Sequence, residues 1–300
     1  MSVRNACSGC WTTDPVTALP DSITEAACLV LRTAKPADKA EATRRIARAW
    51  ERGAFHGIGG AVPPDRPARP DRPELRPPAQ MPRRRINSAP AGRIALLHAL
   101  AHIELNAIDL AWDIIARFAG QVGEARRFCG DWIGVAADEA RHFTLLSERL
   151  AALGACYGDL PAHDGLWEAA AATRDNLAAR LAVVPLVLEA RGLDVTPPMI
   201  EKLRRANDDA SADILEIIHD EEIGHVAAGR RWFEDCCRRC GREPADWFHT
   251  LVREYFKGSL KPPFNRESRD RAGLTAAYYE PLGQIPSAPT RLATTHLQKI

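Results

Sequence analysis

The sequence predicts an all-α protein built around a four-helix bundle, and three observations point to this class. From Ala91 to Lys257 the chain is rich in helix formers, and no useful length of it alternates apolar and polar residues as a strand would. The apolar fraction of 46% is enough to bury a sizeable core. The pattern Glu…Glu-x-x-His also occurs twice, which is typical of helices that hold two metal ions inside such a bundle.

Two short helices are expected before the bundle. Ser22–Glu25 has the sequence of a capping box and opens the first helix, which Lys35-Pro36 ends. The second helix should run from about Ala37 to Arg52, where a glycine follows. We therefore expect residues 1–60 to form an N-terminal helical appendage that docks on the main body.

Residues 61–88 form a connector that is rich in proline and arginine. Eight prolines lie between Pro63 and Pro82, so the segment should be extended and could lie across the bundle surface. It also carries seven arginines, including the run Arg83–Arg85. Nucleic acid is one anionic partner compatible with this run, although a solvated linker explains the same composition.

Residues 89–258 should supply the bundle itself. Glycine and proline divide this region into five expected helices, at about 92–120, 124–154, 166–192, 197–240 and 244–257. Pro185 should kink the third helix, and the fourth could be interrupted near Asn207. The tail, residues 259–300, is rich in Gly, Pro and Ser and is expected to be mostly irregular.

Four glutamates and two histidines are the candidate functional residues. Glu139–His142 and Glu222–His225 are Glu-x-x-His motifs, preceded by Glu104 at 35 residues and by Glu189 at 33 residues. Each glutamate interrupts a mainly apolar helical stripe, so all four should face the core. A histidine three residues after a glutamate emerges on the same helix face.

Buried carboxylates need compensation for their charge. An unpaired ionised carboxylate in a core costs several kcal/mol, and four such groups would also repel one another. Two divalent cations relieve all four and give the histidines a role. Because oxygen-rich ligation favours iron or manganese, the sequence predicts two Fe ions, or alternatively Mn, held by six ligands: Glu104, Glu139, His142, Glu189, Glu222 and His225.

Three further residues are expected near this site. A ligating imidazole usually gives its second N–H to a carboxylate or carbonyl. Asp138 and Glu221 precede the motif glutamates directly, and each could reach the histidine of the opposite helix. Glu221 could also compete with Glu222 as a ligand, because it lies four residues before His225. His219, one turn before Glu222, could line the substrate side.

The cysteines and the overall composition restrict the environment. Two Cys-x-x-Cys pairs, at Cys7/Cys10 and Cys237/Cys240, could hold zinc, but they lie at opposite ends of the chain, so reduced thiols are expected. No apolar run reaches the length of a membrane span, and the polar N-terminus carries no secretory signal. We expect a cytoplasmic protein without membrane contact. The net charge of +1 gives no general attraction to nucleic acid.

The motif residues carry a family resemblance. Asp138–His142 is similar to the Asp-Glu-x-Arg-His motif of the ferritin-like di-iron carboxylate superfamily. More closely, residues 89–263 resemble an uncharacterised ferritin-like family, domain of unknown function 455. The stretches that carry this likeness are Arg66–Arg85, Ser88–Arg93, Leu97–Glu104, Leu188–Asp194 and Asp220–Val226. The resemblance implies a ferritin-like four-helix bundle with a long crossover between its second and third helices, and it implies the same six metal ligands.

The ligand set and the resemblance favour a di-iron oxidoreductase that activates O2 to hydroxylate or oxidise a small molecule or a modified nucleoside. An external electron donor is expected, because the sequence has no flavin or dinucleotide fingerprint. Two alternatives stay open: a dimanganese protein that disproportionates peroxide, and a non-enzymatic iron-binding protein. A homodimer is compatible with an enzyme, and a discrete dimer with only two metals per chain would reject iron storage. A metal-free interaction module is disfavoured by the cost of burying the acids.

Overall fold

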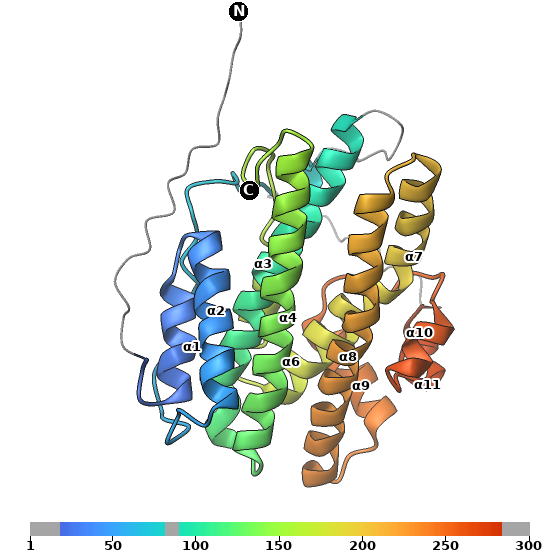
Figure 1. The fold of residues 1–300 in the computed structure, drawn as a ribbon. Coiled ribbons are helices and arrows are strands. Elements are labelled where there is room, and N and C mark those ends of the chain that lie inside the picture. Colours follow the sequence, from blue (N-terminus) through green and yellow to red (C-terminus); the bar gives the residue numbers. More distant parts are fainter. Residues whose placement is uncertain (1–18, 82–89, 284–300) are drawn as a thin grey trace, which may run out of the picture.

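The computed structural model describes residues 19–81 and 90–283, and within these ranges the protein is all-helical, without a strand. The all-α prediction is therefore confirmed. Figure 1 shows the long helices side by side, with α1 to α4 (blue to green) on one side and α7 and α8 (yellow to orange) on the other. The Cys7/Cys10 pair and the Arg83–Arg85 run lie outside the described residues.

The two N-terminal helices are present where the sequence placed them, as α1 (Ile23–Arg32) and α2 (Pro36–Glu51). The capping box is formed, since the Ser22 N–H donates to Glu25 Oε2 at 3.1 Å and the Glu25 N–H donates to the Ser22 hydroxyl. Helix α1 packs against α3, and α2 packs against α4. Their apolar side chains belong to the same buried core as those of α3 and α4.

The central pair consists of α3 (Pro90–Phe118) and α4 (Ala125–Ala152), joined by the short 3-10 helix η2 (Ala119–Gln121). Helix α3 contradicts the expectation that no apolar stretch is long enough to span a membrane. Among the described helices, it is the one that, together with η2, is long and apolar enough to cross a membrane. However, 72% of its most apolar window is buried inside the structure, because α3 contacts α1, α2, α4 and α5. Such a helix is apolar nearly all round because it is surrounded by protein.

The prediction of a single helix at 166–192 is wrong. The structure has four elements there instead, namely α5 (Gly165–Ala172), α6 (Leu177–Val183), the π-helix η3 (Val184–Glu189) and α7 (Ala190–Arg205). Asn176 starts α6 as its N-cap, since its side chain accepts the Ala179 N–H at 3.0 Å. Pro185 lacks an N–H and lies inside η3, where the hydrogen-bond register changes from α to π.

Helix α7 also continues where the sequence predicted a break. It runs through Gly192 and includes Pro197-Pro198, which were expected to open the next helix. Proline at position 197 leaves the carbonyl of Leu193 without its helical donor. The side-chain amide of Asn265 donates to this carbonyl at 3.2 Å. A contact from a distant part of the chain thus compensates for the proline.

Helix α8 (Asp209–Cys240) is separate from α7, because Asn207 adopts a left-handed conformation with φ +54° and Asp208 caps the new helix. Helix α9 (Pro244–Tyr255) follows. The described part of the tail, residues 259–283, includes two helices that the sequence did not predict, α10 (Arg266–Arg271) and α11 (Ala276–Gly283). Both short helices bury side chains against α7, α8 and α9, which composition alone does not reveal.

The proline-rich connector is extended and crosses the helices, as the sequence indicated. The Ala68 N–H donates to the carbonyl of Leu31 at 2.7 Å, and the Arg76 N–H donates to that of Ala162 at 2.8 Å. Within residues 61–81, the described part of the connector, one regular turn forms, the 3-10 helix η1 (Pro78–Gln80). The connector therefore ties α1 to the connection between α4 and α5.

Candidate metal centre

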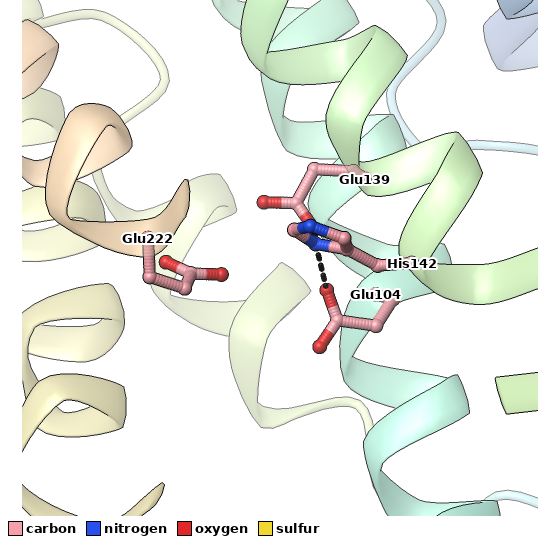
Figure 2. Close-up of side chains that lie close together, drawn as sticks. All are labelled: Glu104, Glu139, His142 and Glu222. Carbon is pink, nitrogen blue, oxygen red and sulfur yellow. Dashed lines mark hydrogen bonds and ion pairs between the residues drawn. The ribbon is translucent and has the colours of Figure 1, made fainter. Parts of the chain in front are cut away.

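The predicted metal ligands come from four elements that meet in the interior. Glu104 lies on α3, Glu139 and His142 lie on α4, and Glu222 lies on α8. One ligand atom from each of these four residues lies within 4.8 Å of the other three. Figure 2 shows Glu222 reaching from α8 towards the three side chains of α3 and α4.

The other two predicted residues border the same cluster. His225 Nδ1 lies 3.0 Å from Glu139 Oε1 and 3.7 Å from Glu222 Oε2. Glu189 ends η3, and burial together with the charges of Glu222 and Glu139 raises the pKa of its carboxyl well above the usual range. The structure thus brings all six side chains to one region, while their role as ligands stays a prediction.

A close backbone approach places Glu189. A Cβ atom added to Gly229 of α8 would lie 2.4 Å from the Cβ of Pro185, so only glycine lets η3 pack this closely on α8. The π-helical turn ends at Glu189 and so positions this residue beside the cluster. π-Helical turns of this kind occur frequently at functional sites.

The cluster is deeply buried. Glu139 and His142 are fully inaccessible, Glu104 is 3% exposed, and the side chain of Glu222 is 13% exposed. Burial raises the pKa of Glu104 and of Glu222. Burial opposes the charged form of His142 as well, but the hydrogen bond to Glu104 and the nearby Glu139 carboxylate raise its pKa to about 11.

Several buried atoms of the cluster make no hydrogen bond of good geometry, although Glu139 lies within ion-pair distance of both histidines. These atoms are both carboxylate oxygens of Glu139, Oε2 of Glu189, Oε2 of Glu222 and Nδ1 of His225. Buried polar atoms are normally satisfied, and each exception calls for an explanation such as an ion. Carboxylate oxygens and imidazole nitrogens are also good ligands for a divalent cation. The residues present therefore fit a metal ion, and the cluster could hold one.

Asp138 and Glu221, which we call the outer acids, each pair with the histidine of the opposite helix. His142 Nε2 lies 2.7 Å from Oε2 of Glu221 on α8, and His225 Nε2 lies 3.3 Å from Oδ2 of Asp138 on α4. Both imidazoles therefore turn Nδ1 towards the cluster and Nε2 towards an outer acid. This is the crossed arrangement that the sequence suggested, and it places Glu222 rather than Glu221 inside the cluster.

Arg141 joins these two outer acids, a contact that the sequence reasoning missed. Its Nη2 donates to Asp138 Oδ1 at 3.2 Å and also forms an ion pair with Glu221. Arg141 stands between the glutamate and histidine of its own motif, so its position was the available signal. The side chains of α4 and α8 are thus linked over the outer face of both imidazoles.

His219 contacts the C-terminal helices, since its Nε2 is 3.1 Å from the hydroxyl of Ser268 in α10. His219 and His225 lie three residues on either side of Glu222, so they are about 120° apart around α8 and face different neighbours. A role for His219 on the substrate side stays a prediction. His102 of α3 is buried elsewhere, and its Nδ1 lies 2.8 Å from the hydroxyl of Tyr157.

Comparison with known proteins extends the likeness beyond the site. A family model described as "Protein of unknown function (DUF455)" matches residues 32–280, from the end of α1 into α11. A protein of Haemophilus influenzae strain Rd, described as "Uncharacterized protein", is 42% identical over 210 residues, which cover 69% of this chain and 73% of the relative. No solved structure matches the chain.

Proposed function

We propose that this chain, which belongs to the DUF455 family, is a di-iron carboxylate oxidoreductase that uses O2 to hydroxylate or oxidise a small molecule or a modified nucleoside. The observation that carries the proposal is the buried cluster of Glu104, Glu139, His142 and Glu222, which His225 and Glu189 border. This donor set matches the one that di-iron helical bundles use.

The arrangement of the long helices supports a ferritin-like four-helix bundle. In this interpretation α3, α4, η3 with α7, and α8 each contribute one side of the site. Residues 153–176, which include α5, would be the long crossover between the second and third bundle helices. The match to the ferritin-like pattern rests on the ligand set and on this order of elements.

Each residue has a proposed task. Glu104, Glu139 and His142 would hold one ion, and Glu189, Glu222 and His225 would hold the other. Glu139 would serve both ions, since its carboxylate lies 3.5 Å from His142 and 3.0 Å from His225. When bound, two iron ions supply the redox chemistry that activates O2. Asp138 and Glu221 would fix the orientation of the imidazoles by accepting their outer N–H groups.

The chain also contributes by excluding water from the cluster. Helices α3 and α4 exclude water from Glu104, Glu139 and His142, which strengthens the electrostatic interactions among them. Electrons would come from an external donor. The arginine run, which would be the contact for a modified nucleoside in RNA, lies outside the described residues.

Anaerobic titration of the metal-free protein with Fe2+, followed by O2 uptake in the presence of a chemical reductant, tests this proposal. We expect two ions per chain and O2 consumption that the Glu139→Ala variant loses. Binding of fewer than one Fe2+ or Mn2+ per chain would overturn the metal site. Evolution of O2 from peroxide by the Mn-loaded protein would replace the proposal with the dimanganese alternative, and many more than two ions per chain would indicate iron storage.

A further inference from the structure

The two lone glutamates are followed by the same short pattern. Glu104-Leu-Asn-Ala-Ile-Asp109 and Glu189-Ala-Arg-Gly-Leu-Asp194 each place an aspartate five residues after the glutamate. Five residues turn an α-helix about 140° beyond a full turn, so each aspartate points away from the metal cluster. Both aspartates are nevertheless buried, with 0% of Asp109 and 7% of Asp194 exposed. The cations that hold Asp109 come from outside the four long elements of the site. Asp194 has one such outside partner, Arg269, and a second cation, Arg191 of its own helix α7, 3.3 Å from Oδ2.

Asp109 is held by two cations from the N-terminal part of the chain. Lys39 of α2 is 1% exposed and forms an ion pair with Asp109 Oδ1. Arg69 of the proline-rich connector places Nη1 2.8 Å from Oδ2. Arg69 also donates to the side chain of Asn106, two residues after Glu104. We name Lys39, Arg69 and Asp109 the N-terminal clamp.

Asp194 is held in the same way from the C-terminal part of the chain. Arg269 of α10 is 2% exposed, and it donates from Nε to Oδ1 at 2.8 Å and from Nη2 to Oδ2 at 2.7 Å. Its Nη2 also donates to the carbonyl of Ala190, the residue directly after Glu189, at 3.2 Å. The guanidinium lies 4.5 Å from the ring centroid of Tyr279, which restricts it further. We name Arg269 and Asp194 the C-terminal clamp.

Stability alone does not account for two such buried ion pairs. The cost of removing both charges from water offsets most of their attraction, and well-packed apolar residues often stabilise a core as much or more. A two-pronged Arg–carboxylate contact does, however, fix geometry closely. Here each contact fixes the rotation of the helix that carries a lone glutamate, and metal ligands must be held to within about 0.5 Å.

We propose that the two clamps are positioning devices for the metal centre. Lys39 and Arg69 set the orientation of Glu104 through Asp109, and Arg269 sets that of Glu189 through Asp194. The parallel positions of the two aspartates and the external origin of Lys39, Arg69 and Arg269 carry this inference. It rests on the proposed function in one respect, namely that the six clustered residues bind two metal ions.

The double variant Asp194→Leu/Arg269→Met tests the C-terminal clamp without leaving an unpaired buried charge. In an anaerobic Mn2+ titration followed by EPR, we expect one ion to bind as in the wild type. The other should bind about 10- to 100-fold more weakly, as for the loss of outer contacts in metal sites. The EPR signal of an isolated Mn2+ should then appear where the wild type gives a coupled pair. Arg266→Met, on the exposed side of α10, is the matched control and should change neither affinity.

Two results would overturn the clamp proposal. One is a double variant that binds both ions with wild-type affinity, and the other is an equal loss of both affinities together with a lower Tm. If the double variant does not fold, Arg269→Lys replaces it, because it keeps the charge but loses the two-pronged contact. This variant should weaken one ion alone, and unchanged binding of both would reject the clamp. A wild-type protein that binds no metal would instead reject the proposed function.

Discussion

The α3–α4 half of the cluster and the η3–α8 half use the same residue types but differ in their packing. Glu104 and His142 lie on unbroken helices, are almost inaccessible, and are joined by a hydrogen bond of 3.3 Å. Glu189 ends a π-helical turn, its Oε2 has no hydrogen-bond partner, and the side chain of Glu222 is partly exposed. The first half therefore has an internal hydrogen bond that arranges Glu104 and His142 before any ion binds. In the second half Glu189 Oε2 lacks such a bond, and Glu222 lies nearer to solvent.

The largest effect is expected where the two halves meet. Glu139 lies between His142 and His225, so Glu139→Gln should abolish binding of both ions while keeping the size of the side chain. Metal content after dialysis against Fe2+ or Mn2+ measures this. Glu148→Gln, on the exposed side of the same helix, should retain both ions. Retention of one ion by Glu139→Gln would show that the halves are independent.

The outer acids should show that each half depends on the opposite helix. Asp138 of α4 contacts His225 of α8, so Asp138→Asn should weaken metal binding about 10- to 100-fold through the α8 half. A double-mutant cycle of metal-binding free energies checks through which histidine Asp138 acts. Asp138→Asn should be non-additive with His225→Ala and additive with His142→Ala. The reverse pattern would contradict the crossed arrangement.

The same contrast explains what the sequence could predict. Helices α3 and α4 follow directly from an unbroken apolar period, and the six candidate ligands follow from two repeated motifs with nearly equal spacings of 35 and 33 residues. The crossed pairs of Asp138 and Glu221 also followed from their positions. The sequence signals behind these features are local, because each motif and its flanking acid lie on one helix, although the pairs they form join α4 and α8.

The remaining features depend on contacts between distant parts of the chain. Helix α7 passes through Pro197 because Asn265 donates to the carbonyl that the proline leaves free. Helices α10 and α11 form in a tail of unfavourable composition because Arg269 and Tyr279 are buried there. The repeated Glu-x4-Asp pattern was visible in the sequence, but its meaning depends on cations located far from it in the chain.

Replacing Glu189 should stabilise the metal-free protein. Its buried, unpartnered carboxylate oxygen is a cost without an ion, so Glu189→Leu should raise the free energy of unfolding by about 1–3 kcal/mol in chelator. The gain should grow with pH. The folded-state pKa of Glu189 is raised, so its contribution is most favourable below the ordinary carboxyl pKa and is lost as the pH rises. Urea unfolding at several pH values measures this.

Glu104→Leu is the matched comparison for that prediction. Glu104 is hydrogen-bonded to His142, so its loss leaves a buried imidazole without this partner, and the gain should be smaller or absent. An equal gain at both positions would contradict the difference in packing between the two halves.

The smallest expected effects are changes in stability, and they should have opposite signs in the two halves. Gly134 lies on the exposed side of α4 with open space around it, so Gly134→Ala should stabilise the protein by about 0.5–1 kcal/mol through helix propensity. At Gly229 of α8, the added methyl group would meet Pro185 at 2.4 Å, and this overpacking should outweigh the same gain and destabilise the protein. Thermal unfolding of both variants in chelator measures the two signs.

The same two substitutions should also differ in metal binding. Since Pro185 must move to admit the methyl group, Gly229→Ala should weaken binding of the ion nearer Glu189, whereas Gly134→Ala should leave the binding of both ions unaffected. Stabilisation by both substitutions would mean that the η3 backbone yields easily and that close packing against α8 does not place Glu189.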